Sequence, residues 1–112
     1  LLNLGNGIFS DQVTYPTGNS SAPSGSTSVV VVDVNNDNRP DIAVVNENSN
    51  NVGVLLNVGN GTFSDQVTYP TGNSTNRSSP KSVAVVDVNN DNRPDIIVAN
   101  FDSNSVGVLF HC

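Results

Sequence analysis

The sequence has 112 residues, the size of one small domain, and its ten acidic and four basic residues give a formal net charge of −6. With 12% charged residues it lacks the composition of a disordered tail, and without a basic patch it is not expected to bind nucleic acid. No apolar run approaches the roughly 20 residues that a membrane-spanning helix needs, so we expect no membrane span.

The chain consists of one unit written twice. Shifted by 54 positions, it aligns with itself without gaps, and 14 of the first 54 pairs differ, which leaves 40 identical (54 − 14). The longest shared stretch includes "FSDQVTYPTGNS". We therefore predict two repeat units, residues 1–54 and residues 55–112, of which the last four residues begin a third unit. Leu1 is not an initiator methionine, so we expect the sequence to begin inside a longer polypeptide.

Short strands are predicted at even spacing along each unit, because Val-rich runs alternate with Asn, Gly, Pro and Ser turns. Asn60 and Gly61 form a hairpin signal of type I′ character. The two runs on either side of residues 35–40 are apolar at nearly every position, which suits strands covered on both faces. In chain order the predictions are the end of one unit at 1–15, strands at 28–34, 41–46, 51–58 and 62–69, a surface loop at 70–81, and three further strands within 82–112.

Four short antiparallel strands per unit, repeated in tandem, are typical of β-propeller blades. The predicted fold class is therefore all-β, with tandem four-stranded antiparallel blades. Two units leave exposed strand edges, and closed propellers have about four to eight blades. We therefore expect the chain to belong to a larger propeller, array or assembly, with like repeats or copies of itself as partners.

The stretch "DVNNDNRPD" occurs twice, at 33–41 and 87–95, and holds six of the ten acidic residues. Its odd positions offer oxygen atoms from Asp, Asn and Asp side chains, from the backbone carbonyl of Arg, and from a last Asp. Calcium takes six to eight oxygen ligands, and three carboxylates in one loop would otherwise repel one another. We therefore predict two Ca²⁺ sites, one per repeat, with the metal residues Asp33, Asn35, Asp37, Arg39 and Asp41 in the first and Asp87, Asn89, Asp91, Arg93 and Asp95 in the second.

These loops have two other interpretations. An EF-hand needs flanking helices and a glutamate at position 12, where this sequence has Val44 or Val98. An Asx-rich turn with solvated acids is the structural alternative.

Position 6 of each loop is Asn38 or Asn92 in place of Gly, and Asn tolerates left-handed backbone angles well. The side chains of both arginines are expected to point outward or to pair with a neighbouring carboxylate.

The segment "SVVVVDVNNDNRPDIAVVNENSNNVGVLLNVGNGTFSDQVTYPTG" resembles the FG-GAP/VCBS repeat, the calcium-loop blade of integrin-alpha-type propellers and of many secreted repeat proteins. The resemblance covers essentially the whole chain. It implies a propeller blade with Ca²⁺ in the hairpin between its first two strands, at the ten positions already named. It also implies an extracellular location, secreted or at the cell surface, although fold alone does not fix function.

The remaining candidate residues suggest modification rather than chemistry. N-x-[S/T] sequons predict N-glycosylation at Asn19, Asn60, Asn73 and Asn76, with Asn60 the weakest because it lies in a tight turn. His111 is the sole histidine and is expected at a strand edge, so no catalytic set is available. Cys112 is expected to be buried near a strand end or to form a disulfide outside this sequence. The aromatic residues Phe9, Tyr15, Phe63 and Tyr69 are expected to pack between blades, with a sugar-stacking platform as the alternative.

From these observations we predict that the protein is a non-enzymatic extracellular structural or adhesive module. We expect Ca²⁺ to stabilise it and expect it to assemble with like units into an array, a filament or a matrix. One alternative is a propeller that binds a glycan or a protein ligand, in a lectin-like or integrin-like manner. Another is a scaffold segment of a larger secreted enzyme. We expect calcium affinity on the order of 10⁻⁴–10⁻³ M, as in extracellular modules. Removal of Asp33 or Asp87 is expected to lower stability in calcium and to change little in chelator.

Overall fold

The computed structural model describes residues 2–5, 7–18, 25–72 and 78–111. All regular secondary structure within these ranges is β-strand, and every paired strand is antiparallel. The described residues form no helix that is long and apolar enough to cross a membrane. This confirms the all-β class that the sequence predicts.

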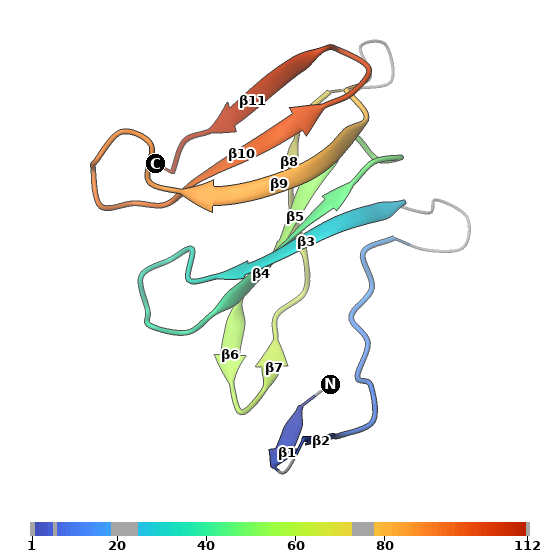
Figure 1. The fold of residues 1–112 in the computed structure, drawn as a ribbon, viewed down its shortest axis with the longest axis vertical. Coiled ribbons are helices and arrows are strands. Elements are labelled where there is room, and N and C mark those ends of the chain that lie inside the picture. Colours follow the sequence, from blue (N-terminus) through green and yellow to red (C-terminus); the bar gives the residue numbers. More distant parts are fainter. Residues whose placement is uncertain (1, 6, 19–24, 73–77, 112) are drawn as a thin grey trace.

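The strands form two larger sheets and two small hairpins (Figure 1). The first sheet has four strands in the order β3-β4-β5-β8, and the second has three in the order β11-β10-β9. The hairpins pair β1 with β2 and β6 with β7. The bounds are β1 Asn3–Gly5, β2 Ile8–Phe9, β3 Ser26–Val32, β4 Asp41–Asn46, β5 Asn51–Leu55, β6 Asn57–Gly59, β7 Thr62–Phe63, β8 Val67–Pro70, β9 Pro80–Val86, β10 Asp95–Asn100 and β11 Ser105–Leu109.

Most predicted strands are present, with differences in their extent. The strand expected at 28–34 is β3, which begins and ends two residues earlier, and β9 begins at Pro80, inside the loop expected at 70–81. The strand expected at 51–58 divides into β5 and β6 at Leu56, and the strand expected at 62–69 divides into β7 and β8. At this break the Leu56 amide donates to Ser64 Oγ (3.0 Å), so a side chain replaces a backbone acceptor and the regular ladder is interrupted. The Asn60-Gly61 turn has φ of 54° and 73°, which confirms the left-handed conformations of a type I′ hairpin.

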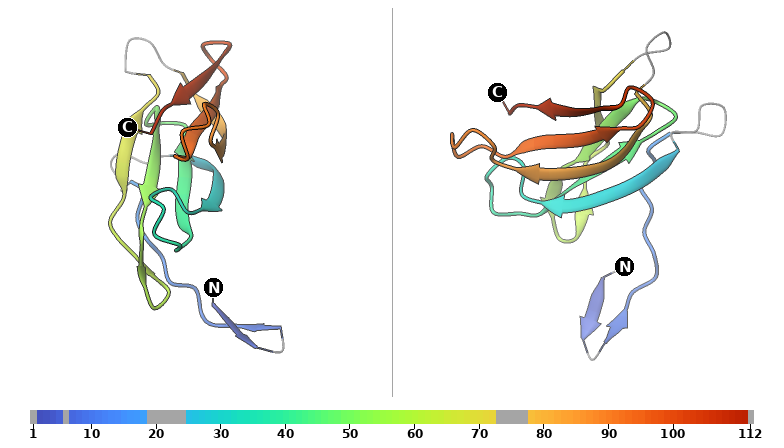
Figure 2. Two further views of the ribbon diagram at one scale, coloured as in Figure 1. Left: turned by 90° about the vertical axis from the view of Figure 1, so that its left-hand side faces the viewer. Right: turned by 45° about the horizontal axis from the view of Figure 1, so that its top comes forward.

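The second sheet packs on one face of the first, with β9 lying across β3 and β4 (Figures 1 and 2). The core between the sheets is built from short aliphatic side chains. Val45 and Val52 of the first sheet are fully buried, and Val98 of the second is 1% exposed. Because a β-strand places alternate side chains on opposite faces, these Val-rich strands supply a continuous apolar surface to the neighbouring sheet.

The expectation that both apolar runs are covered on both faces is right for β4 and wrong for β3. β4 is buried along its length apart from half-buried Ile42. β3 is an edge strand of its sheet, and one of its two faces is open. Val29 and Val31 on that face are each 61% exposed.

Polar contacts join the two units at the end of the β4–β5 hairpin. Buried Asn50 accepts hydrogen bonds at Oδ1 from the amides of Ser78 and Ser79, both at 3.1 Å. Lys81 Nζ lies 2.7 Å from Glu47 Oε1 and 5.4 Å from the centre of the Phe101 ring. The Asn50 contacts are buried, so they are worth more than the partly exposed ion pair.

Candidate metal centre

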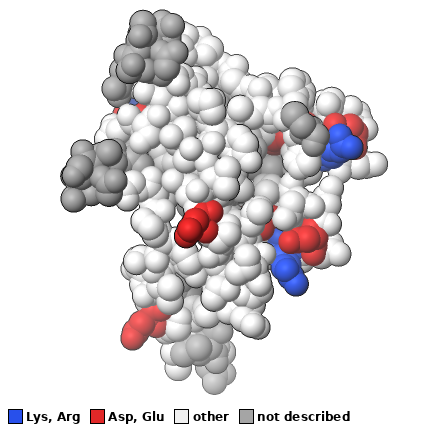
Figure 3. Space-filling view, turned by 180° about the vertical axis from the view of Figure 1, so that it is seen from behind, with Lys and Arg blue, Asp and Glu red and all other residues white. Residues whose placement is uncertain are grey.

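The two acidic loops lie on the same side of the molecule, one between β3 and β4 and the other between β9 and β10 (Figure 1). Seen from behind, acidic and basic side chains gather at two places on this side (Figure 3). Each loop reverses the chain between two paired strands, so the pairing holds the first and last acids of each loop close together.

The first aspartate of each loop organises the backbone that follows it. Asp33 Oδ1 accepts from the amides of Asn35 (3.3 Å) and Asp37 (3.2 Å), and Asp33 Oδ2 accepts from the amide of Asn38 (2.8 Å). Desolvation raises the pKa of Asp33, but these backbone N–H groups together outweigh it and hold the pKa below its ordinary value. The pKa of Asp87 is lowered for the same reasons. Both carboxylates therefore stay ionised, as metal ligands must.

The last aspartate of each loop is fully buried and begins the next strand. Asp41 accepts at Oδ2 from the amide of Val34 (2.9 Å) and at Oδ1 from the amide of Asn57 (2.8 Å). Asp95 accepts in the same way from Val88 and from His111. Each buried carboxylate thus ties the start of its loop to the chain after the third strand of its sheet, which fixes one wall of the site.

The side chain at position 3 lies directly between two carboxylates. One terminal atom of the Asn35 amide lies 3.0 Å from Asp33 Oδ1 and 2.9 Å from Asp37 Oδ1. A nitrogen at this place would donate to both acids, whereas an oxygen would join a group of three oxygens that needs a cation. Asn89 has the same two neighbours in the second loop, at 3.0 Å each.

Left-handed residues shape both loops. Asn38 and Asn92, at position 6, both have φ of 64°, which confirms that Asn takes the conformation usually supplied by Gly. Asn36 and Asn90, at position 4, have φ of 61° and 60°. Position 4 was not predicted to take this conformation, although the same preference of Asn for left-handed angles was the available signal.

The donor set fits a hard divalent cation. Asp33, Asp37 and Asp41 each offer an oxygen within 4.8 Å of the others, as do Asp87, Asp91 and Asp95. Arg39 and Arg93 are exposed, and within the described ranges no basic side chain forms an ion pair with these six acids. The repulsion within each triad is therefore not relieved by a protein cation. An all-oxygen set of this kind suits calcium better than zinc or copper.

The two loops also touch one another. Asn36 Nδ2 donates to the carbonyl oxygen of Asn92 (3.1 Å) across 56 positions of the sequence. Asn92 in turn donates its amide to Asp87 Oδ2 (2.8 Å). This connection between the two candidate sites was not predicted, because it depends on how the second sheet lies against the first.

The other candidate residues have ordinary structural surroundings. Tyr15 packs edge-on against Phe63 with 5.7 Å between ring centres, which agrees with the packing expected of these two aromatics. Phe9 and Tyr69 are 56% and 45% exposed, so the packing expected of them is not observed. His111 is part-buried, and its Nδ1 has no partner among the described residues. Asn60 lies in its exposed turn. The sequons at Asn19, Asn73 and Asn76, together with Cys112, lie outside the described residues.

Comparison with protein families identifies one matching family. The model of the FG-GAP-like repeat matches residues 1–44 and again residues 33–98, so the two matches together span most of the chain. Searches of curated proteins and of solved structures found no match.

Proposed function

Because the chain belongs to the FG-GAP-like repeat family, we propose that it is a non-enzymatic extracellular structural or adhesive module whose repeats are β-propeller blades stabilised by Ca²⁺. The observation that carries this proposal is the occurrence of two equivalent oxygen clusters, each with three carboxylates within 4.8 Å. The first sheet, with its four antiparallel strands in sequential order, supports the assignment of a blade.

In this proposal the ion acts on stability rather than on chemistry. Asp33, Asn35, Asp37 and Asp41, with the backbone carbonyl of Arg39, would hold one ion, and the equivalent five residues of the second loop would hold another. A bound Ca²⁺ supplies positive charge that offsets the repulsion among the three carboxylates. The hairpins β3–β4 and β9–β10 would then resist opening, since the folded loops bind calcium and an unfolded chain lacks the site.

The wider role follows from the packing of like units. The second sheet covers one face of the first through short aliphatic side chains, and the same kind of surface recurs in every repeat. We propose that further repeats or further copies extend this packing into an array, a filament or a matrix. In a secretory pathway the sequons at Asn19, Asn73 and Asn76 would carry glycans, with Asn60 disfavoured by its tight turn.

The test is calcium titration of the 112-residue chain by calorimetry, combined with thermal unfolding in calcium and in chelator. We expect two binding events with affinities on the order of 10⁻⁴–10⁻³ M and a higher unfolding temperature in calcium than in chelator. Magnesium at the same concentration serves as the control for charge screening. Unfolding curves that coincide in calcium, magnesium and chelator would reject the proposal.

A further inference from the structure

One apolar face of the first sheet is buried under the second sheet, whereas the equivalent face of the second sheet is exposed to solvent. Residues opposite one another in a sheet share a face, so Val45, Val52 and Val54 lie on the face of the first sheet that the second sheet covers. Their exposed fractions are 0%, 0% and 6%. The equivalent residues 54 positions later include Val106 and Val108, which are 69% and 43% exposed. We call this open surface of the second sheet the free face, defined by Ala84, Val86, Ile97, Ala99, Val106 and Val108.

The first sheet has an exposed apolar face equivalent to the face of the second sheet that packs at the internal junction. Val83 and Val85 of β9 are half-buried on the side of the second sheet that packs on the first. Their equivalents are Val29 and Val31 of β3, each 61% exposed. The open faces at the two ends of the molecule are therefore the two halves of the junction that already exists within the chain.

The second sheet is also short of an outer strand within the described residues. β8 pairs with β5 in the first sheet, whereas β11 has β10 on one side and no strand on the other. A cavity of about 600 Å³ between the two sheets reaches this open edge, with Tyr69 of β8 and Val108 of β11 in its lining. The cavity lies where the first sheet has an outer strand and the second has none among the described residues.

A second segment of the chain has the same sequence as that outer strand. Residues 11–18 read "DQVTYPTG", identical to residues 65–72, which include β8. Residues 13–16 lie outside every strand, and Val13 is 65% exposed. The pairs Val52–Tyr69, Gly53–Thr68 and Val54–Val67 of the first sheet, shifted by 54 positions, become Val106–Tyr15, Gly107–Thr14 and Val108–Val13.

Two polar groups on the second sheet have matching partners in such an arrangement. In the first sheet the amide group of Asn46 bonds to that of Gln66 (3.0 Å). The equivalent Asn100 has a buried Oδ1 with no partner among the described residues. The oxygen of Asn46 accepts from Ser26 Oγ (3.0 Å), and Pro80 at the equivalent position has no hydroxyl, which explains the unpaired oxygen of Asn100. The equivalent of Gln66 is Gln12, which is exposed and would accept from the Asn100 nitrogen as Gln66 accepts from Asn46 Nδ2.

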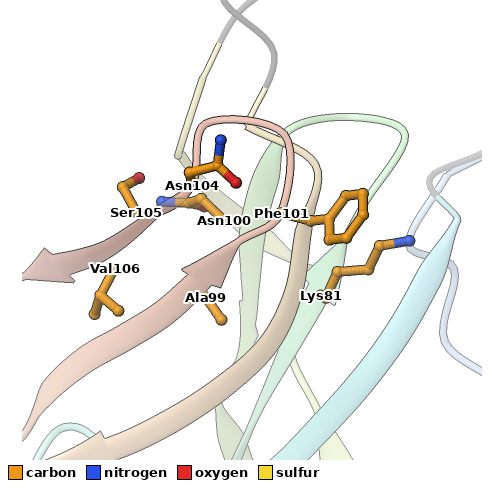
Figure 4. Close-up of a pocket in the computed structure, with 7 residues that line it drawn as sticks. All are labelled: Lys81, Ala99, Asn100, Phe101, Asn104, Ser105 and Val106. Carbon is orange, nitrogen blue, oxygen red and sulfur yellow. The ribbon is translucent and has the colours of Figure 1, made fainter.

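The second polar group is Asn104, the equivalent of Asn50. The two have φ of 52° and 54°, but Asn104 is exposed and lines an open depression of about 390 Å³ with Phe101 and Val106 (Figure 4). Asn50 accepts from the amide of Ser79, whose equivalent is Gly25, and both of these residues have positive φ. The amide of Gly25 is thus the matching donor for Asn104.

We infer that a second copy of this chain binds head to tail, with its residues 13–16 added as the outer strand on β11 and its first sheet laid on the free face. Both contacts come from one copy, because Tyr15 is held to Phe63 of the β6–β7 hairpin, which connects β5 to β8 of its own first sheet. The two residues share a ring contact and a hydrogen bond from the Phe63 amide to the Tyr15 hydroxyl (3.3 Å). The inference rests on the proposed packing of like units, and it names the partner, the strand and the register.

The first test measures assembly of the 112-residue chain by sedimentation velocity over a range of concentrations in calcium. We expect the parent to associate beyond the monomer and Val106→Glu to associate at least about tenfold more weakly, because its carboxylate would be buried without a partner. Val58→Glu is the matched control, since Val58 is 57% exposed on β6, in a hairpin that belongs to neither sheet. Circular dichroism checks that both variants fold.

The second test measures the register in a Cys112→Ser background. A chain with Val13→Cys, mixed with a chain with Val108→Cys, should form a disulfide-linked dimer under mild oxidation, because opposite Cβ atoms lie about 5 Å apart. Thr14→Cys with Val108→Cys is the control, since those two side chains would lie on opposite faces. Equal cross-linking of both pairs overturns the inferred register.

The outcomes separate this inference from the proposed function. A chain that gains stability in calcium but stays monomeric at every concentration keeps the calcium module and overturns the inference. A chain that assembles as described without any response to calcium supports the inference and rejects the calcium role.

Discussion

Asp41→Asn separates the structural role of the last loop aspartate from its role toward calcium. The carboxylate is fully buried, and each of its oxygens accepts one backbone N–H, from Val34 and from Asn57. An asparagine of the same shape keeps one acceptor and presents an NH₂ group to the other backbone amide. One buried N–H therefore loses its acceptor, and the first loop loses one of its three carboxylates.

The structural cost follows from the unpaired backbone donor. A buried donor without an acceptor costs about 1–3 kcal/mol of folding free energy. For a domain of this size, roughly 4 °C of unfolding temperature corresponds to each kcal/mol, so we expect a loss of roughly 4–12 °C in chelator. The parent should tolerate this cost, because domains of this size have about 5–15 kcal/mol of stability.

The calcium contribution follows from mass action. At about 10 mM calcium, a site with a dissociation constant on the order of 10⁻⁴–10⁻³ M stabilises the fold by roughly 1.4–2.7 kcal/mol. The parent has two candidate sites, and the variant keeps the one built around Asp95. The calcium-induced increase in unfolding temperature should therefore fall to about half of the parent value.

Differential scanning calorimetry of parent and variant, each in calcium and in chelator, measures both quantities. Asp65→Asn is the matched control, since it removes the same charge from an exposed position outside both loops. Asp37→Asn is a second variant, because Asp37 is exposed and accepts one backbone bond, from Arg39. The reasoning fails if the calcium-induced increase in both loop variants equals that of the parent.

Three further substitutions test other parts of the structure. Asn38→Val should cost about 1–2 kcal/mol of stability because of its left-handed backbone, whereas Asn38→Gly should stay close to the parent in chemical denaturation. Gly53→Ala should be destabilised by about 1–3 kcal/mol, since the new Cβ would overlap the Gln66 carboxamide, while Gly107→Ala, with nearest atoms at 3.0 Å and 3.1 Å, should lose less. Asn36→Gly removes the bond between the loops without backbone strain, so calcium binding to the two sites should become less cooperative by calorimetry.

Local chemistry explains how much of the fold could be predicted from the sequence. β4 was predicted with both ends correct, because a loop full of turn-forming residues precedes Asp41 and an Asn-rich turn follows Asn46. The break at Leu56 could not be predicted, since the residues keep their strand pattern and only a serine hydroxyl replaces one backbone acceptor. The open face of β3 was also missed, because an apolar strand does not reveal whether a neighbouring sheet covers it.

The candidate site was also predicted in part from the sequence. The spacing of the acids predicts two oxygen clusters, and the structure brings the three acids of each loop together. The backbone bonds of Asp33 were not foreseen, although they connect it to three amides of its own loop. For this reason, removal of Asp33 is now expected to lower stability in chelator as well as in calcium. An acid can thus shape a loop before any ion binds to it.

The two candidate calcium loops lie at the junction between the sheets rather than at a remote edge. The bond from Asn36 to the carbonyl of Asn92 joins the first loop to a residue whose amide is held by Asp87. An ion that fixes either loop therefore also fixes one side of the contact between the sheets. If the junction between copies repeats the internal one, Asn90 would reach the first loop of the next copy as Asn36 reaches the second. Calcium would then stabilise the stacking of units as well as each hairpin, because every junction would contain two loops that touch.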